Sequence, residues 1–198
     1  MLIKSNFEVA LPVEKVWQFF DDIPQVAACL PGAELTEDLG NEKYLGGVNI
    51  RMGPVKMHFA GTAQIKERDD AAKRIVVDAV GAEERGRGQA AMQVTANLAP
   101  TPVGTRVEVA QDLQLSGAAA QYGRGMISDV TAILMRDFAT NMQNRIDAID
   151  RGLSPDQIGK TTPASGFAIA LSAMRLALTR VFRRFFVPYR TNPALRRI

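Results

Sequence analysis

The chain has 198 residues, a formal net charge of +3 at pH 7 and 46% hydrophobic residues, an ordinary composition for a globular protein. This composition excludes wholesale disorder and collagen-like repeats, and the length favours one domain with an appendage over two full domains. One cysteine excludes a disulfide within the monomer, and one histidine, His58, excludes a multi-histidine metal site built from a single chain.

The first residues predict a strand. Phe7 and Val9 alternate with Glu8, which is the pattern of a half-buried strand within residues 2–10. This stretch lacks the apolar core and the small-residue cleavage site of a signal peptide. A lone cysteine also suits a reducing compartment, so we expect a cytoplasmic protein.

Two short helices are predicted after this strand. Pro12 suits the first turn of a helix, where a missing N–H group costs little, and apolar residues follow at helical spacing as far as Phe20. A second short helix is predicted over residues 24–29, before the turn at Pro31 and Gly32.

Five or six strands are predicted next. Turn signals separate the apolar segments, and short connectors between consecutive strands imply antiparallel neighbours. Met57 and Phe59 share one face of a strand whose other face carries Lys56 and His58, so the sheet has an apolar face that needs a cover. The predicted strands lie near residues 33–39, 42–52, 55–68, 73–81, 87–99 and 103–115.

A long amphipathic helix over residues 118–150 is predicted to supply that cover. Its apolar residues recur at spacings of three and four from Met126 to Ile149, and its length would be about 45 Å. A long helix across a strongly curved antiparallel sheet, with two short helices at the other end, is a helix-grip arrangement of the α+β class. Residues 1–150 are therefore predicted to form one helix-grip domain.

The charge of the chain divides beyond this domain. Residues 151–165 contain two prolines and almost nothing apolar, which predicts a flexible linker. Residues 157–198 contain eight basic and no acidic residues and carry +8, whereas the sixteen basic and twenty-one acidic residues of 1–156 give −5. This asymmetry indicates a basic tail that meets an anionic partner.

Residues 166–187 predict a basic amphipathic helix, followed by a basic tail at residues 188–198. As an interfacial helix, it would place its arginines among anionic headgroups and its large apolar side chains in the acyl boundary. Spanning the bilayer is disfavoured, because each arginine near the centre costs about 2.5–3.5 kcal/mol. Packing on a partner protein or on the domain is the alternative, and nucleic acid does not account for the apolar face. The predicted membrane-binding residues are Phe167, Leu171, Met174, Arg175, Leu178, Arg180, Phe182, Arg183, Arg184 and Phe185.

The domain carries no residue pattern typical of catalysis or metal binding. Cys29 has no histidine relay beyond His58 and is interpreted as a small buried hydrophobe. Acidic pairs such as Glu83 and Glu84 lie at predicted turns, where turn formation and capping explain them. We therefore predict no catalytic residue, no metal and no required cofactor.

An apolar cavity between the sheet and the long helix is the predicted functional feature. Small residues such as Gly46 and Gly61 leave space between the layers, and flexible methionines suit an adaptable apolar surface. Tyr44 and Tyr122 are the best polar candidates, because each hydroxyl offers one hydrogen bond to a carbonyl. The predicted ligand-binding residues are Trp17, Phe20, Tyr44, Met57, Phe59, Met92, Tyr122, Met126, Val130 and Leu134.

The chain resembles the CoxG-like family of carbon monoxide dehydrogenase subunits, within the SRPBCC or START helix-grip superfamily. The segments that carry the resemblance are FEVALPVEKVW at 7–17, VAACLPGA at 26–33 and GTAQI at 61–65. The opening pattern is common in the superfamily, and its combination with the LPG turn is typical of the CoxG group. The resemblance covers roughly residues 1–150.

The resemblance implies a function that the residue patterns alone do not show. Members of this family accompany molybdenum- and flavin-containing dehydrogenases and are associated with placing them at the membrane, and superfamily members bind apolar ligands. With the predicted cavity and tail, this implies a protein that holds menaquinone, ubiquinone or another lipid and recruits a carbon monoxide dehydrogenase type enzyme to the cytoplasmic face of the inner membrane. It would link that enzyme to the quinone pool. The alternatives are a structural recruitment or assembly factor without a ligand, and a cyclase or hydrolase of the same superfamily.

Overall fold

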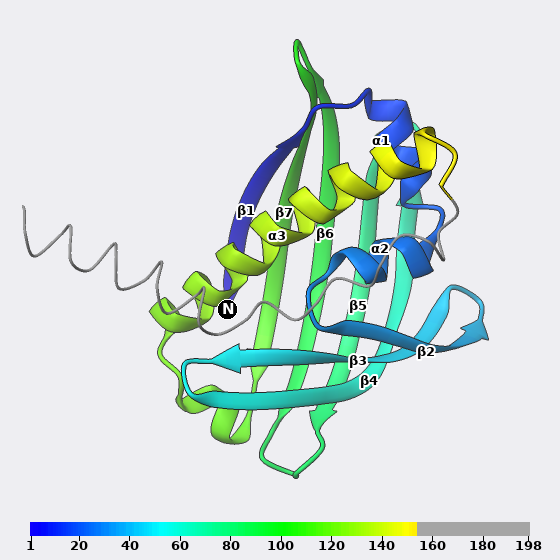
Figure 1. Ribbon diagram of the computed structural model, residues 1–198. Coiled ribbons are helices and arrows are strands. Elements are labelled where there is room, and N and C mark those ends of the chain that lie inside the picture. The colour runs from blue at the N-terminus through cyan, green and yellow to red at the C-terminus, as the bar shows by residue number, and fades with distance from the viewer. Residues whose placement is uncertain (154–198) are drawn as a thin grey trace, which may run out of the picture. The chain divides into compact units, whose positions relative to one another are not determined.

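The computed structural model describes residues 1–153. Most of the predicted linker, the predicted helix at residues 166–187 and the predicted basic tail at residues 188–198 lie outside the described residues. The described part contains a seven-stranded antiparallel sheet, two short α-helices and one long α-helix (Figure 1). In chain order the elements are β1 (Leu2–Val9), α1 (Val13–Phe19), α2 (Ile23–Cys29), β2 (Ala33–Gly40), β3 (Lys43–Met52), β4 (Val55–Asp69), β5 (Arg74–Glu83), β6 (Gln89–Thr101), β7 (Gly104–Leu115), the 3-10 helix η1 (Gly117–Gln121) and α3 (Arg124–Asp150).

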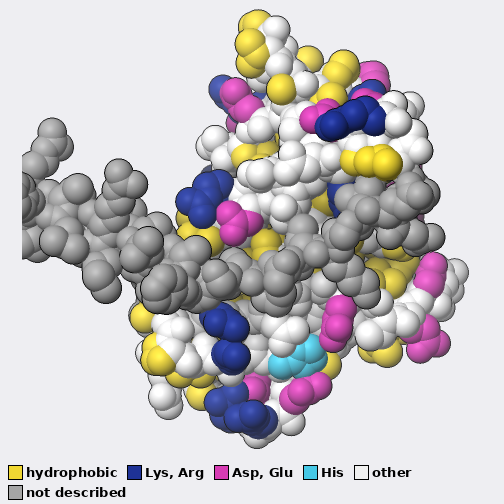
Figure 2. All heavy atoms as spheres, in the orientation of Figure 1, with side chains coloured by type: hydrophobic (Ala, Val, Ile, Leu, Met, Phe, Trp, Pro, Cys, Tyr) yellow, Lys and Arg dark blue, Asp and Glu magenta, His cyan; other side chains and the backbone are white. Residues whose placement is uncertain are grey.

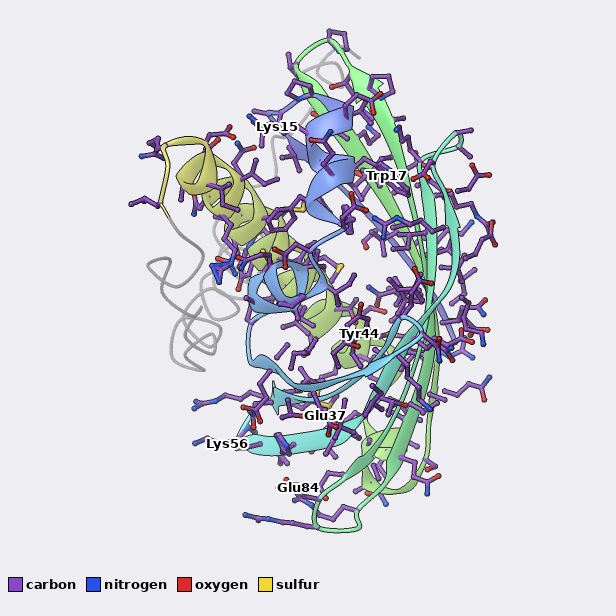
Figure 3. The ribbon with its side chains drawn as sticks, turned by 90° about the vertical axis from the view of Figure 1, so that its right-hand side faces the viewer. Lys15, Trp17, Glu37, Tyr44, Lys56 and Glu84 are labelled. Atoms are coloured by element: carbon purple, nitrogen blue, oxygen red, sulfur yellow. The ribbon has the colours of Figure 1, made fainter. Side chains whose placement is uncertain are left out.

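The sheet is a meander whose far edge is completed by the first strand. Strands β2 to β7 pair in sequence order and β1 pairs with β7, so the order is β1-β7-β6-β5-β4-β3-β2. All six pairings are antiparallel, as the short connectors predict. Helix α3 runs across the concave face, and α1 and α2 lie beside its C-terminal half (Figures 1 and 3). This arrangement confirms the predicted helix-grip fold of the α+β class.

The sheet bends where glycines pair across three strands. Gly46 of β3 pairs with Gly61 of β4, which pairs with Gly81 of β5. A Cβ atom on Gly61 would lie 2.0 Å from the carbonyl oxygen of Val80, and one on Gly46 would lie 2.4 Å from that of Glu34. Glycine therefore permits the close backbone approach at this bend, beyond which β3 and β4 run across the end of the sheet (Figure 1).

Inward-facing apolar side chains form two separate buried clusters. The larger cluster joins α1, α2 and the C-terminal half of α3 to the sheet, and it contains Trp17 and Met142. The smaller cluster contains Met52 and Met57 near the β3–β4 turn, together with Ala119 of η1. The two clusters occupy opposite ends of the concave face, so they leave a middle region between them.

The long helix begins later than predicted and ends at the predicted residue 150, and apolar residues near both of its ends are exposed. Residues 117–121 form the 3-10 helix η1, and α3 begins at Arg124. Met126 is 44% exposed and Ile149 is also exposed, whereas the neighbouring Ile127 is buried. A step of four residues advances about 40° beyond one turn, so an apolar stripe built from such steps drifts around the helix. Its ends therefore leave the face that covers the sheet.

Within residues 1–153, no helix is both long enough and apolar enough to cross a membrane.

Candidate functional site

The middle of the concave face carries one continuous row of inward-facing side chains across five strands. The row belongs to neither buried cluster, and its members are half-buried. Each member is the direct cross-strand partner of the next, so the row crosses the sheet from β3 to β7. In that order the residues are Tyr44, Ala63, Ala79, Met92 and Leu113, and we call them the central row.

The row of paired residues beside the central row consists of glycines and one alanine. The paired glycines of the bend, Gly46, Gly61 and Gly81, continue into Ala90 of β6. Because these residues have almost no side chain, they do not fill the space above the bend. The half-buried state of the central row and the small neighbouring row together give a concave apolar surface between the two clusters.

Tyr44 contributes the hydroxyl of the central row. Burial raises the pKa of the Tyr44 phenol, and the carboxylates of Asp38 and Glu42 raise it further against the opposing effect of Arg68. The phenol is therefore protonated at neutral pH and is able to donate one hydrogen bond. An apolar surface with one hydroxyl donor suits an apolar molecule that carries a carbonyl or hydroxyl group.

Helix α3 contributes half-buried apolar residues as well. Val130 and Leu134, both predicted ligand-binding residues, are half-buried and belong to neither cluster. A groove of about 640 Å³ lies between β1 and the same helix, and it is lined by apolar and polar side chains together with the charged side chains of Glu8 and Arg136. Its lining includes Ser5, Phe7, Ala132, Met135, Ala139 and Gln143.

Trp17 and Phe20 do not lie in the middle region. Both are buried in the larger cluster, and Trp17 is 4% exposed. In Figure 3, Trp17 lies at the level of α1 and Tyr44 lies farther along the sheet. Sequence spacing correctly predicted that both apolar residues face inward. Helix α1 and the residue after it place them in the larger cluster, at the end of the domain that this cluster closes.

The other side of the middle region, away from Trp17 and Phe20, is formed by Met57, Phe59 and Tyr122. Met57 and Phe59 are buried in the smaller cluster, and the half-buried Tyr122 packs against it. The side chain of Met126 is exposed, and its role as a lining residue stays a prediction. Of the predicted ligand-binding residues, the structure thus brings Tyr44 and Met92 together in the central row and distributes the others around it.

Sequence reasoning did not single out the buried polar residues Gln111 and Arg145. Gln111 of β7 is 6% exposed, and its Nε2 atom donates to Met135 Sδ at 3.4 Å, which is a weak acceptor. Arg145 of α3 is 5% exposed in the interior. Gln111 follows the alternation of the inward-facing Val109, so strict period-two counting would have found it.

Glu83 is also buried, and it organises the β5–β6 turn. Its carboxylate accepts from the Arg87 guanidinium at 2.5 Å and from the backbone N–H groups of Arg85 and Arg87 at 2.9 and 3.2 Å. The hydrogen bond from the Arg87 side chain, more than any other contact, lowers the pKa of Glu83 to about 2. This ion pair and the two backbone hydrogen bonds give Glu83 a structural role, in keeping with its predicted place at a turn.

Cys29 and His58 lie apart from each other. Cys29 is fully buried, its thiol donates to the Gln25 carbonyl at 3.2 Å, and burial raises its pKa to about 12. The His58 ring lies 3.0 Å from Asn49 Oδ1 and 3.3 Å from Glu84 Oε1. A neutral buried thiol is a poor nucleophile. Across residues 1–153, no three His, Cys, Asp or Glu side chains gather closely enough to hold a metal ion.

Comparisons with known proteins agree on the fold. A family model for CoxG, described as a carbon monoxide dehydrogenase subunit, matches residues 6–147. A conserved protein from Geobacillus kaustophilus is similar with a TM-score of 0.66 at 22% identity, over 74% of this chain and 95% of that one. An aromatase/cyclase from a Streptomyces species has a TM-score of 0.55 at 14% identity, over 76% and 96% of the two chains. A START superfamily protein from Mycobacterium smegmatis has a TM-score of 0.52 at 12% identity, over 75% and 98%. No curated protein matches the sequence.

Proposed function

Since the chain belongs to the CoxG family of carbon monoxide dehydrogenase subunits, we propose that it is a non-enzymatic protein that holds a quinone or another lipid against its concave sheet face. In this proposal the protein recruits a molybdenum- and flavin-containing dehydrogenase to the membrane and links it to the quinone pool. It acts on the cytoplasmic face of the inner membrane.

The central row is the single observation that carries the ligand proposal. Met92 and Leu113 point inward from the middle of the sheet, yet neither side chain is covered by one of the two buried clusters. Each square ångström of apolar surface that a ligand removes from water contributes about 25 cal/mol. A prenylated quinone offers a large apolar surface for this row, and its ring carbonyl is a suitable acceptor for the Tyr44 hydroxyl.

The recruitment proposal rests on different support. The family description names a component of carbon monoxide dehydrogenase, which makes an enzyme of that type the proposed protein partner. Membrane binding is proposed from the arginines and large apolar residues of 166–187, which lie outside the described residues. A quinone is insoluble in water, so a carrier of this kind would need contact with both the enzyme and the bilayer.

A matched pair of variants tests the ligand proposal. Ala79 belongs to the central row, whereas its chain neighbour Val80 lies on the outer face and is 56% exposed. Ala79→Phe fills the middle region, and Val80→Phe adds a similar side chain outside it. Detergent-free protein from cells is analysed by native mass spectrometry, and its lipid extract is analysed for prenylated quinones.

The expected result is a co-purifying quinone in the natural protein and in Val80→Phe, with clear loss in Ala79→Phe. Equal quinone content in the two variants would contradict binding at the central row. Protein without any apolar ligand, and without quinone uptake from liposomes, would favour the structural recruitment factor. Turnover of an added polyketide or ester would favour the cyclase or hydrolase alternative.

A further inference from the structure

Three segments that are distant in sequence meet at one end of the domain. The Arg87 side chain donates to the Lys56 carbonyl at 3.1 Å, which joins the β5–β6 turn to the β3–β4 turn. The N–H group of Ala118 donates to the Arg87 carbonyl at 2.6 Å, which joins η1 to the same turn. We call the surface formed by residues 51–56, 84–88 and 116–126 the loop end.

The loop end is basic although the described part of the chain is acidic overall. Residues 1–153 contain sixteen basic and twenty acidic residues, whereas the three segments of the loop end contain five basic residues against Glu84 and the adjoining Glu83, which pairs with Arg87. Figure 2 shows Lys and Arg side chains gathered at this lower end of the molecule. The basic residues of the loop end are Arg51, Lys56, Arg85, Arg87 and Arg124.

The ion pairs of the loop end leave most of this positive charge at the surface. Arg87 is paired with Glu83, and Glu84 lies 3.3 Å from the His58 ring. Arg51 and Lys56 are direct cross-strand partners, so their side chains leave the same face of the β3–β4 hairpin side by side. Like charges at this spacing repel each other, and an anionic partner would relieve that repulsion.

The loop end also contains exposed apolar side chains. Met126, on the first turn of α3 after Arg124, is 44% exposed. Pro54 is exposed at the tip of the β3–β4 turn. Cations around exposed apolar side chains fit an anionic lipid surface, where the charges meet headgroups and the apolar groups enter the acyl boundary.

The opposite end of the same hairpin strand is acidic. Glu37, Asp38 and Glu42 lie at the β2–β3 turn, at the other end of β3 from the loop end. The ten residues of β3 separate the two turns by about 30 Å. The domain therefore carries a charge dipole that turns the loop end towards a negative surface and the acidic turn away from it.

We propose that the loop end is a second membrane-contact surface, located on the domain itself, which binds anionic lipid headgroups. The inference rests on the proposed function, because a protein that exchanges a lipid-like ligand needs its domain, in addition to its tail, at the bilayer. Arg85 and Arg124 provide the charges and Met126 provides the apolar contact.

The test uses the full chain and vesicles of phosphatidylcholine, alone or mixed with phosphatidylglycerol. The loop-end variant is Arg85→Glu with Arg124→Glu. The control is Lys4→Glu with Lys66→Glu, two exposed lysines away from the loop end, which changes the net charge equally. Binding is measured by sedimentation at several salt concentrations, with circular dichroism to confirm folding.

The loop-end variant is expected to lose about fivefold in partitioning for each arginine removed, on the mixed vesicles and at low salt. The control should lose less, and Met126→Ser should also weaken binding without any change in charge. Equal losses in both charge variants, or no loss in either, would overturn the proposal. Loss of binding to the purified dehydrogenase, with vesicle binding kept, would overturn it in favour of a protein partner.

A separate measurement distinguishes this proposal from the ligand proposal. The quinone content of the loop-end variant is expected to equal that of the natural protein, because neither arginine belongs to the central row. If the natural protein contains no quinone and takes up none from liposomes, yet binds mixed vesicles through the loop end, the ligand proposal fails and the surface proposal stands.

Discussion

The indole Nε1 of Trp17 donates a hydrogen bond of 2.8 Å to Asp70, 53 residues away along the chain. This bond ties α1 to the β4–β5 turn. The cations of Arg68 and Lys73 lie 5.2 and 5.6 Å from the centre of the Trp17 ring, which is a favourable cation–π distance. Lys73 also pairs with Glu14 of α1 at 2.7 Å. The closed end of the domain is thus held by one tryptophan and its charged neighbours.

Trp17→Phe is expected to lower the free energy of unfolding by about 1–3 kcal/mol, because it removes the hydrogen bond and weakens both cation–π contacts. Asp70→Asn keeps a hydrogen-bond acceptor beside the indole, so it should lower the free energy of unfolding less than Trp17→Phe does. Urea unfolding followed by circular dichroism measures both values. Equal stability of Trp17→Phe and the natural protein would show that the hydrogen bond and the cation–π contacts contribute nothing net.

The lowered pKa of Glu83 predicts how the stability of the domain depends on acid pH. Its pKa falls from 4.5 to about 2, so the unfolded state binds more protons than the folded state between these values. Stability from Glu83 is therefore fully present above about pH 4.5 and is lost as the pH falls towards 2. Urea midpoints measured across this range should fall more steeply for the natural protein than for Glu83→Gln. Parallel pH profiles for the two proteins would contradict this role of the carboxylate.

Cys29 is expected to resist alkylation in the folded protein. The thiol is fully buried and its pKa is about 12, so very little thiolate exists near neutral pH. Iodoacetamide should modify Cys29 readily in urea and at a far lower rate under native conditions. Mass spectrometry of timed samples provides the measurement. Equal rates in both conditions would show that the thiol is open to solvent.

Gly61→Ala is expected to destabilise the domain by about 1–3 kcal/mol, because the new Cβ would lie 2.0 Å from the Val80 carbonyl oxygen. Gly125→Ala provides the matched control. A Cβ at this helical position meets nothing within 4 Å, and alanine favours a helix by about 1 kcal/mol over glycine. The midpoint temperature of thermal unfolding should therefore fall for Gly61→Ala and rise for Gly125→Ala. A neutral Gly61→Ala would mean that the bend relaxes freely.

Much of the fold was predictable because its determinants are local. The alternation of Met57 and Phe59 with Lys56 defines the two faces of β4, and the structure confirms them. Turn residues mark the hairpins, and short connectors leave antiparallel pairing as the simple solution. The apolar residues of α1 were also assigned correctly to the interior, including Trp17 and Phe20.

The candidate site was predictable only in part, because its members meet across strands. Tyr44 and Met92 were predicted separately, but the central row depends on the register that makes Ala63 and Ala79 their intermediates. Ala79 carries no local signal of a binding role, and Ala63 stands out only as one of the small residues that leave space between the layers. The lining role of Met126 stays a prediction, and its side chain is exposed because the drift of the helical stripe takes it away from the sheet.

The sequence by itself determined the element types, the inward face of most strands and the division of charge, since these follow from the spacing and composition of neighbouring residues. The tertiary structure alone decided which apolar residues are packed and which remain half-covered between the two clusters. It also decided that the segments that carry Arg51, Arg85 and Arg124 meet at one end of the domain. The physical reason is that burial and shared charge depend on distances between segments, which register, sheet curvature and the bend at Gly61 establish.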